Sequence, residues 1–536
     1  HAYFGKNVNV SVKAVEGVGK PFNGKLRLTL YSEDGKSTFS EKKFSLKSGE
    51  EKKTEISASA PRYGYYEIEV SCINNDGNSE GNASESISVI APAEKLNPKI
   101  GFSAHISKNY GFIPDKVKMA AEAGVGTIRD EIRWTEFETT RGIFKPDKFT
   151  QGYIDFTNET NQNKLAILGY WFPGRTLTGL PRTEEDIKAF KAYVTKVLEY
   201  TKDMDIDYEL WNEQNMYVGP DYGSIQDYVD LAKLVYPLKE KINPDAKLYV
   251  LAVANVETVR EYVEECFKLG IGDYCDGVTI HPYNVTLPPD DAKFQSDVYD
   301  IADLMEKYGL SDKELVISEL GWTTSVGWAD EDMQADYTIR SAALYSDIAE
   351  KIYFYNLQEK STGTVTDTEL HFGFLRGWAY TPIPYEPKPA FLALSNYNRL
   401  MTDSEKVRKV EHSDENVSMH LFRNANGTNT IIAWSTGKDI ETAINTGTDK
   451  VTICDIYGNE SVISTRNGVI DLALSSRPIY IIGDIKDVTE TEAAFHITQK
   501  EIEAVENDTL SISGNVADGE WIIEAECPDN ITVSDI

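Results

Sequence analysis

Two glutamates, Glu213 and Glu319, each stand at the end of a short apolar run in the middle of the sequence. Hydrolysis of an acetal needs two carboxyl groups, because one protonates the leaving oxygen while the other attacks or stabilises the electron-poor carbon. Other polar residues that end or follow apolar runs are His105, Arg129, Asn212, His281 and Tyr283. These residues can act together only if a fold brings the ends of the runs to one place.

The apolar runs alternate with amphipathic helical stretches from residue 99 to residue 403. Candidate strands fall at 100–104, 127–129, 165–170, 208–211, 248–252, 277–281, 315–319 and 352–356. Helical patterns lie between them, for example at 184–202, 224–241 and 334–350. This alternation predicts a (β/α)8 barrel, whose active site lies at the carboxyl ends of the strands. The alternative is a doubly wound open sheet, which usually has a glycine-rich turn after its first strand, and the sequence lacks one.

In such a barrel the fourth and seventh strands stand on opposite sides of the mouth. Glu213 follows the fourth candidate strand and Glu319 ends the seventh, so their carboxyl groups can flank one bond.

Patterns typical of β-sheets flank the predicted barrel on both sides. Residues 1–95 alternate apolar and polar side chains between turn signals such as Asp34-Gly35, which predicts an immunoglobulin-like β-sandwich. Residues 404–485 return to this pattern and predict a second β-sandwich, and residues 486–536 read as a partial further β module or an acidic tail. The expected fold class is therefore α/β, with a (β/α)8 TIM barrel between two β-sandwiches.

Charge and composition exclude several classes of function. Lys and Arg total 54 against 86 for Asp and Glu, a net charge of −32, so phosphate backbones would be repelled and we expect no nucleic-acid partner. No apolar run approaches the ~20 residues that span a bilayer, and we expect no membrane span. The 5 cysteines form no CxxC pair, and the 7 histidines show no HxH or HExxH spacing. We therefore expect no metal and no cofactor.

Several motifs around the two glutamates resemble those of glycoside hydrolase clan A, most of all family 39 and related retaining glycosidases. Leu210-Trp211-Asn212-Glu213-Gln214-Asn215 is similar to the acid/base motif of that clan, and Val316-Ile317-Ser318-Glu319-Leu320-Gly321-Trp322 is similar to its nucleophile strand. The segment 129–134, with Glu136 and Gly142, resembles the second strand of these enzymes. His281-Pro282-Tyr283 resembles their sixth strand, and Pro387-Lys388-Pro389-Ala390 the turn before the closing helix.

This resemblance implies a retaining glycoside hydrolase that cleaves an oligo- or polysaccharide by double displacement. Glu213 would be the general acid and then the general base, and Glu319 the nucleophile. The resemblance also implies that Asn212 bonds the sugar's 2-hydroxyl, that Arg129 keeps Glu319 ionised, and that Tyr283 donates a hydrogen bond to Glu319. His105 and His281 would line the pocket.

Aromatic side chains beyond the strand ends are further candidates, because sugar rings stack their C–H faces on aromatic rings. Trp171 and Trp322 follow strand ends, and we expect both to bind the substrate. Trp328 and Trp378 lie further along such loops, and the long loop 358–385 carries His371, another candidate contact.

Three other interpretations stay open at this stage. A non-catalytic carbohydrate-binding protein on a barrel scaffold would have a broken carboxylate pair, whereas both glutamates are present. A metal-dependent barrel hydrolase using His105 and His281 would lose its activity on chelation. A transglycosylase would share the covalent intermediate but pass the sugar to another sugar, so its products would distinguish it.

A polysaccharide substrate and a multidomain chain favour a secreted or cell-surface protein of bacterial origin. The sequence starts at His1 without a Met, and its last residues still follow a strand-like pattern. We expect it to be a mature or trimmed part of a longer protein.

Overall fold

The computed structural model describes residues 2–17, 19–108, 114–169, 179–254, 256–360, 364, 366–377 and 385–491, and two short strands, β25 (Phe495–Ile497) and β26 (Gly514–Val516). Contacts group the chain into two compact units. The first comprises His1–Val407, Phe422–Asn426 and Cys454–Glu460, and the second Arg408–Leu421, Gly427–Ile453 and Ser461–Ile536. The domain limits drawn from the sequence stay a prediction.

Eight parallel strands close into a barrel, which confirms the predicted fold class. They are β8 (Asn97–Ser103), β9 (Val125–Arg133), β10 (Asn163–Gly169), β11 (Ile206–Leu210), β12 (Leu248–Ala254), β13 (Gly277–His281), β14 (Glu314–Leu320) and β15 (Lys351–Tyr355). Pairing of β15 with β8 completes the ring. Because all the strands run parallel, their carboxyl ends share one mouth.

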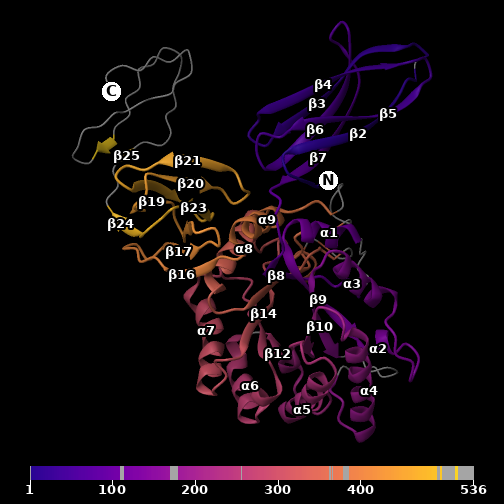
Figure 1. The fold of residues 1–536 in the computed structure, drawn as a ribbon, viewed down its shortest axis with the longest axis vertical. Helices are drawn as coiled ribbons and strands as arrows, with labels where there is room; N and C mark the ends of the chain where they lie inside the picture. Colours follow the sequence, from indigo (N-terminus) through magenta and orange to yellow (C-terminus); the bar gives the residue numbers. More distant parts are fainter. Residues whose placement is uncertain are drawn as a thin grey trace. The chain divides into compact units, whose positions relative to one another are not determined.

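Helices cover the outside of the barrel strands (Figure 1). They are α1 (Pro114–Glu122), α2 (Trp134–Phe137), α3 (Lys148–Glu159), α4 (Glu184–Thr201), α5 (Ile225–Ile242), α6 (Val256–Lys268), α7 (Ala292–Lys307), α8 (Glu331–Tyr345) and α9 (Pro389–Met401), with the 3₁₀ turns η1 (Gln214–Tyr217), η2 (Ile271–Tyr274) and η3 (Thr368–Leu370). Side-chain N-caps fix the residue at which several of these helices begin. The Asp330 carboxylate accepts a hydrogen bond from Met333 N, for example, so α8 begins ahead of the predicted residue 334.

Large side chains fill the interior of the barrel. One buried layer consists of Leu165, Tyr249, Val316 and Tyr353. Gly101 leaves room for the last of these, since a Cβ there would lie 2.4 Å from the Tyr353 ring, and the Tyr353 hydroxyl lies 3.0 Å from Thr127 Oγ1. A substrate must therefore bind at the mouth and not along the axis.

The strands that precede the barrel form two facing sheets, with the orders β1-β7-β6-β3-β4 and β2-β5. These strands are β1 (Ala2–Phe4), β2 (Asn7–Val15), β3 (Phe22–Ser32), β4 (Ser37–Leu46), β5 (Glu51–Ser59), β6 (Gly64–Asn74) and β7 (Ser79–Ile90). Alternate side chains from both sheets, such as Val8, Leu28 and Ile56, meet in one apolar core, as expected for a sandwich.

The strands that follow the barrel form a six-stranded sheet, β16-β17-β18-β23-β20-β21, and a three-stranded sheet, β22-β19-β24. These strands are β16 (Glu405–Lys409), β17 (Val417–Arg423), β18 (Asn429–Ser435), β19 (Ile440–Asn445), β20 (Lys450–Cys454), β21 (Glu460–Ser464), β22 (Val469–Leu474), β23 (Ile479–Gly483) and β24 (Thr489–Thr491). Their shared core includes Met419, Ile444 and Leu472. Antiparallel β-sheets thus precede and follow the barrel along the chain.

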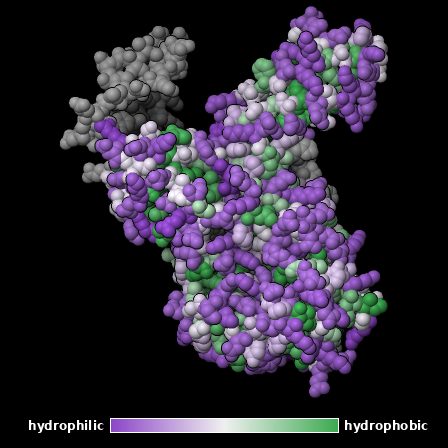
Figure 2. Space-filling view, viewed as in Figure 1, coloured by the Kyte–Doolittle hydropathy of each residue, from purple (hydrophilic) through white to green (hydrophobic). Residues whose placement is uncertain are grey.

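On the face seen in Figure 2, hydrophilic side chains cover most of the surface and apolar ones occur in small separate patches. Among the described residues, no helix is both long enough and apolar enough to cross a membrane.

Candidate active site

Glu213 and Glu319 come from strands that are not neighbours and meet at the barrel mouth. Glu213 follows β11, Glu319 lies near the end of β14, and β12 and β13 stand between these two strands. One carboxylate oxygen of each glutamate and one ring nitrogen of His281 all lie within 4.8 Å of one another. The two carboxyl groups can therefore reach the same bond of a small ligand.

Both glutamates lie beside an irregularity of the strand ladder. Relative to β13, β12 carries one extra residue between Leu251 and Val253, and the carbonyl of Ala252 there accepts a hydrogen bond from Glu213 N at 2.9 Å. Glu213 has φ 51°, a left-handed conformation that non-glycine residues rarely adopt. β14 carries a similar extra residue relative to β15, between Ile317 and Leu320. Such bulges re-aim side chains out of the regular alternation of a strand.

Each carboxylate oxygen of Glu319 accepts one hydrogen bond. Arg129 Nη1 donates to Oε1 at 2.5 Å, and the Tyr283 hydroxyl donates to Oε2 at 2.8 Å. Burial by itself would raise the pKa of this carboxyl group, but the charges of His281 and Arg129 and the two hydrogen bonds outweigh it and hold the pKa below its usual value. Glu319 is therefore ionised at neutral pH.

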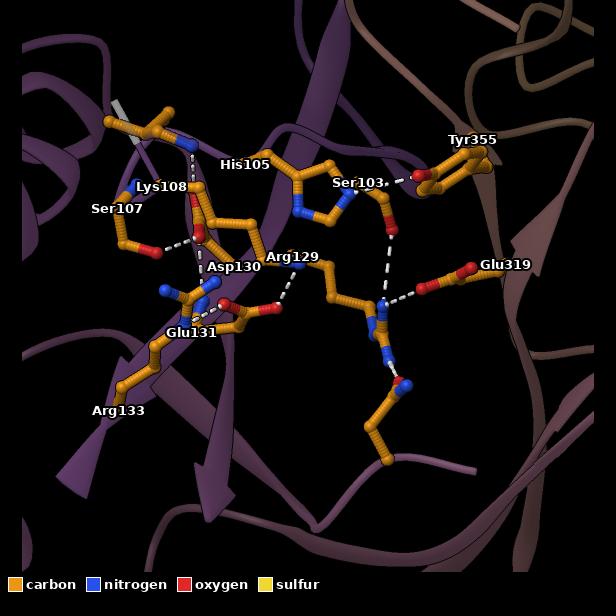
Figure 3. A network of polar contacts seen from close by, with 12 residues as sticks. Ser103, His105, Ser107, Lys108, Arg129, Asp130, Glu131, Arg133, Glu319 and Tyr355 are labelled. Atoms are coloured by element: carbon orange, nitrogen blue, oxygen red, sulfur yellow. Dashed lines mark hydrogen bonds and ion pairs between the residues drawn. The ribbon is translucent and has the colours of Figure 1, made fainter. Parts of the chain in front are cut away.

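Arg129 holds several of the predicted site residues at once (Figure 3). We call Arg129 and its contacts Ser103, Glu209, Asn212 and Glu319 the Arg129 cluster. The guanidinium donates from Nη2 to Asn212 Oδ1 at 2.8 Å and from Nη1 to Ser103 Oγ at 3.3 Å, and both Nε and Nη2 donate to Glu209 Oε2, at 2.9 and 2.5 Å. This buried cation fixes the nucleophile candidate and the Asn212 amide relative to each other.

His281 connects the two candidate catalytic carboxylates. Its ring is fully buried, and Nδ1 lies 2.9 Å from Glu213 Oε1 and 4.0 Å from Glu319 Oε2, while Nε2 lies 3.0 Å from Ser318 Oγ. Because Nδ1 faces only carboxylate oxygens among these contacts, it carries a proton that it donates to Glu213. The Glu213 side chain is 27% exposed against 10% for Glu319, so it is the better placed of the two to exchange protons with water.

His105 reaches the site through an aromatic neighbour. Its Nε2 lies 3.2 Å from the Tyr355 hydroxyl, and the Tyr355 ring packs edge-on against Tyr283, with centroids 6.2 Å apart. Desolvation, helped by nearby cations, holds the pKa of His105 well below its usual value, so the ring is neutral at pH 7. His105 thus supports Tyr283, which in turn contacts Glu319.

Two acidic residues beside Arg129, Asp130 and Glu131, are not among the residues selected from the sequence. Both are 2% exposed. Asp130 accepts hydrogen bonds from the backbone N–H groups of Ile106, Ser107 and Glu131 and from the Ser107 hydroxyl, and burial raises its pKa to about 6. Such residue types are usually solvated, and the one sequence signal for burial was the apolar character of the neighbouring strands.

Glu131 lies between two cations at the same edge of the site (Figure 3). Lys108 Nζ lies 2.6 Å from its Oε1, and Arg133 Nε lies 2.5 Å from its Oε2. Because Arg129 and Glu131 are two residues apart on β9, both side chains point to the same face of that strand.

Within the part of the chain that the structure describes, one group of side chains has the composition and spacing of a metal site, and it is Glu213, His281 and Glu319. A divalent cation there would lie close to the Arg129 guanidinium, which already binds Glu319, so the charge arrangement disfavours it. His105 is not part of the group, which does not fit an interpretation in which His105 and His281 together hold a metal.

The expectation for Trp322 needs correction. Trp322 is 1% exposed, its ring packs against Phe294 and Tyr337, and its Nε1 donates to Leu287 O at 3.0 Å. A ring this deeply buried presents no face to a sugar. Trp328, by contrast, is 41% exposed, and Trp171 and Trp378 lie outside the described residues.

His371, a further candidate contact, belongs to a second buried ionic group, which we call the Lys388 cluster: Lys388, Glu359 and His371. Lys388 Nζ pairs with Glu359 Oε1, His371 Nδ1 lies 3.4 Å from the same oxygen, and Glu359 Oε2 accepts from Gly377 N at 2.8 Å. Lys388 also donates to Thr324 Oγ1 at 2.8 Å and to His371 O at 3.2 Å. The His371 ring therefore contacts protein groups, and this cluster ties the loop after β15 to the start of α9.

No protein-family model and no curated protein sequence matches the chain. Solved structures do match its fold. A family 39 glycoside hydrolase from Bacteroides cellulosilyticus WH2 superimposes with a TM-score of 0.72 at 21% identity, over 90% of this chain and 98% of that one. A monomeric β-xylosidase from Caulobacter crescentus CB15 gives 0.52 at 14% identity, over 73% and 97%. The endo-β1,6-glucanase BT3312 gives 0.52 at 12% identity, over 78% and 98%.

These three proteins share with the chain a barrel of this kind, and the first of them also matches over nearly all of its length. At these identities the match concerns the fold, while the residue roles depend on the geometry described above. The chain therefore has the fold of the clan A glycoside hydrolases, family 39 among them, which agrees with the resemblance drawn from its motifs.

Proposed function

We propose that the protein is a retaining glycoside hydrolase that cleaves glycosidic bonds of an oligo- or polysaccharide, with Glu319 as nucleophile and Glu213 as acid/base. The observation that carries this proposal is the approach of the two carboxylates, with oxygens within 4.8 Å of each other. Retaining enzymes hold their carboxyl groups about 5–5.5 Å apart, whereas inverting enzymes need roughly 6.5–9.5 Å to admit a water molecule between carboxylate and sugar.

In the first step an oxygen of Glu319 forms a bond to the anomeric carbon while the bond from that carbon to the leaving oxygen breaks. The electron pair of the broken bond stays on the leaving oxygen, which takes a proton from Glu213. In the second step Glu213 accepts a proton from water, whose oxygen displaces Glu319 from the anomeric carbon. Glu319 is then an ionised carboxylate again and Glu213 is protonated, so the pair completes the cycle without a cofactor.

The neighbours of the pair support these roles. Arg129 and Tyr283 favour the ionised form of Glu319, as a nucleophile requires. Arg129 also binds Asn212 Oδ1, which leaves the Asn212 amide nitrogen to donate to a sugar hydroxyl, and we assign it to the 2-hydroxyl. A polysaccharide is found outside cells, so we propose that the protein acts there.

A panel of aryl glycosides and polysaccharides, tested with the unaltered protein and with Glu213→Ala and Glu319→Ala, tests the proposal. Both variants should lose at least about 10³-fold in kcat/KM, because the two residues work as one unit. NMR of the first product on the best substrate should show the anomeric configuration of the substrate. Hydrolysis with the inverted configuration, or activity that survives both substitutions and is lost on chelation, would contradict the proposed function.

A further inference from the structure

Two carboxylates share the one guanidinium at the base of the site. Arg129 Nη1 reaches Glu319, and its Nε and Nη2 both reach one oxygen of Glu209. The side chains of Arg129 and Glu209 are 1% and 0% exposed. Because water is excluded from this contact, the charge of Glu209 acts on Arg129 with little screening. The positive charge that Glu319 experiences is therefore reduced by the second carboxylate.

A contribution to folding stability does not by itself explain why Glu209 is buried here. Its second oxygen, Oε1, is buried and finds no hydrogen-bond partner among the described residues. Burying an ionised carboxylate is costly, and a buried ion pair repays that cost only when its remaining polar atoms are also satisfied. An incompletely satisfied carboxylate directly behind the nucleophile's cation is more readily explained by its effect on the site than by its contribution to folding.

We propose that Glu209 is a positioning residue that fixes the guanidinium of Arg129 and takes part of its charge, so that Glu319 stays a strong nucleophile. The proposal rests on the proposed function. Attack on the anomeric carbon removes the negative charge of Glu319, and every attraction between Arg129 and the free carboxylate opposes that step. Without Glu209, the full charge of Arg129 would hold Glu319 as a stable carboxylate, which is a poor nucleophile and a good leaving group.

The groups that face Glu319 come from several strands. Arg129 faces it from β9, His281 and Tyr283 from β13 and the residues after it, and Glu213 from the end of β11. Glu209 also acts on two buried phenols, Tyr228 and Tyr353, which lie too deep to ionise near neutral pH because burial raises the pKa of each. Changes at Glu209 therefore reach Glu319 chiefly through Arg129.

The test compares Glu209→Gln with Glu209→Asp and with a control on the same strand, Asp207→Asn. Asp207 is also a buried carboxylate paired with a cation, Lys351 at 3.0 Å, but it does not contact Arg129. The probes are two aryl glycosides of the sugar that the unaltered enzyme cleaves best. One carries a poor leaving group, phenol, and the other a good one, 2,4-dinitrophenol.

For E209Q we expect kcat/KM on the phenyl glycoside to fall about 10- to 100-fold, since its first step depends on nucleophilic attack. kcat on the dinitrophenyl glycoside should fall much less or rise, because expulsion of Glu319 limits that reaction. The acidic limb of the pH profile of kcat/KM should move down by about one pH unit, since an uncompensated Arg129 favours ionised Glu319. E209D keeps the charge and should restore the position of this limb.

An E209Q enzyme whose acidic limb stays in place, or whose two substrates lose activity equally, overturns the proposal, because a purely structural role would produce that result. If E209Q fails to fold, Glu209→Ala, which also removes the charge, takes its place against E209D and Asp207→Asn: a limb shifted down in Glu209→Ala alone supports the proposal, and identical limbs in the three variants overturn it. Inactivity of the unaltered protein on every glycoside would instead contradict the proposed function. An acidic limb measured in the pH profile of the unaltered enzyme therefore distinguishes a failure of the proposal on Glu209 from a failure of the proposed function.

Discussion

The Arg129 cluster and the Lys388 cluster both bury a cation against carboxylates, yet they differ in what they leave available. In the Lys388 cluster, both oxygens of Glu359 are bound, one by Lys388 and His371 and the other by the backbone N–H of Gly377. In the Arg129 cluster, one oxygen of Glu209 has no hydrogen-bond partner among the described residues, and the Glu319 side chain remains 10% exposed. The first arrangement gives every carboxylate oxygen a partner. The second leaves a charged carboxylate accessible at the barrel mouth.

The largest difference between the clusters should appear when one carboxylate of each is neutralised. Glu319→Gln should lower kcat/KM by at least about 10³-fold, because the proposed nucleophile is lost, while Arg129 keeps Glu209 as counter-ion and the unfolding free energy stays close to that of the unaltered protein. Glu359→Gln should instead lower the unfolding free energy, while kcat/KM measured below the melting transition stays close to that of the unaltered protein. Kinetics on an aryl glycoside and urea unfolding measure the two quantities. An equal loss of unfolding free energy in both variants would contradict this distinction between the two clusters.

Removal of the cation from the Lys388 cluster should be costly for folding. Lys388→Met leaves Glu359 buried without its counter-ion, and we expect the unfolding free energy of the barrel to fall by about 3–5 kcal/mol. The control is Lys118→Met, which breaks an exposed pair with Glu159 at 3.9 Å and should cost less than about 1 kcal/mol. Denaturant melts followed by tryptophan fluorescence give both values, and similar midpoints for the two variants would contradict the prediction.

A buried carboxylate with a raised pKa should give stability a pH dependence opposite in sign to that of Glu319, whose pKa is lowered. Asp130 has a pKa of about 6 in the folded protein, above its value in an unfolded chain, so the folded state holds this proton more tightly. Its contribution to stability is fully present below about pH 4 and is lost as the pH rises through about 6, for a change of up to about 3 kcal/mol. Calorimetry between these pH values should therefore show a steeper fall in stability for the unaltered protein than for Asp130→Asn. Parallel curves would show that Asp130 does not titrate in this way.

The smallest effect concerns one hydrogen bond to the proposed nucleophile, Glu319. Tyr283→Phe removes the donor to Glu319 Oε2, so the pKa of Glu319 should rise and the acidic limb of kcat/KM should move to higher pH. The loss in kcat/KM should be about 10- to 100-fold, which corresponds to roughly 1.4–2.7 kcal/mol. Tyr353→Phe is the matched control, because that buried phenol contacts Thr127 and neither glutamate. A limb that moves in both variants, or in neither, would contradict the assignment.

Much of the fold could be predicted because it depends on patterns that repeat along the chain. The alternation of apolar runs with helical stretches placed all eight barrel strands, and the order of the strands placed Glu213 and Glu319 at one mouth. The hydrogen bond from Tyr283 to Glu319 was implied by the resemblance of His281-Pro282-Tyr283 to the sixth strand of clan A glycoside hydrolases. The roles assigned to these residues stay predictions.

The sequence could not reveal which charged residues are buried, because that depends on contacts between distant strands. Glu209 lies in a predicted strand, yet its significance appears only once Arg129 from β9 is seen against it. Asp130 and Glu131 have the composition of a solvated pair and are buried by the turn after β8 and by Lys108 and Arg133. Trp322 has the position of a sugar-stacking residue, but Phe294 and Tyr337 cover its ring.

The extra residues in β12 and β14 have a consequence for how such a site can change over evolution. The bulge in β14 interrupts the regular pairing with β15 at Glu319, before it resumes at Leu320, and the bulge in β12 supplies the carbonyl that accepts a hydrogen bond from the backbone N–H of Glu213. Closure of the barrel depends on the regular part of each strand, whereas the direction of each glutamate depends on the local insertion. Insertions or deletions at these two points can thus reorient one of the two glutamates while the ring of strands is conserved. A lineage could therefore adjust the separation of these carboxylates without first redesigning its scaffold.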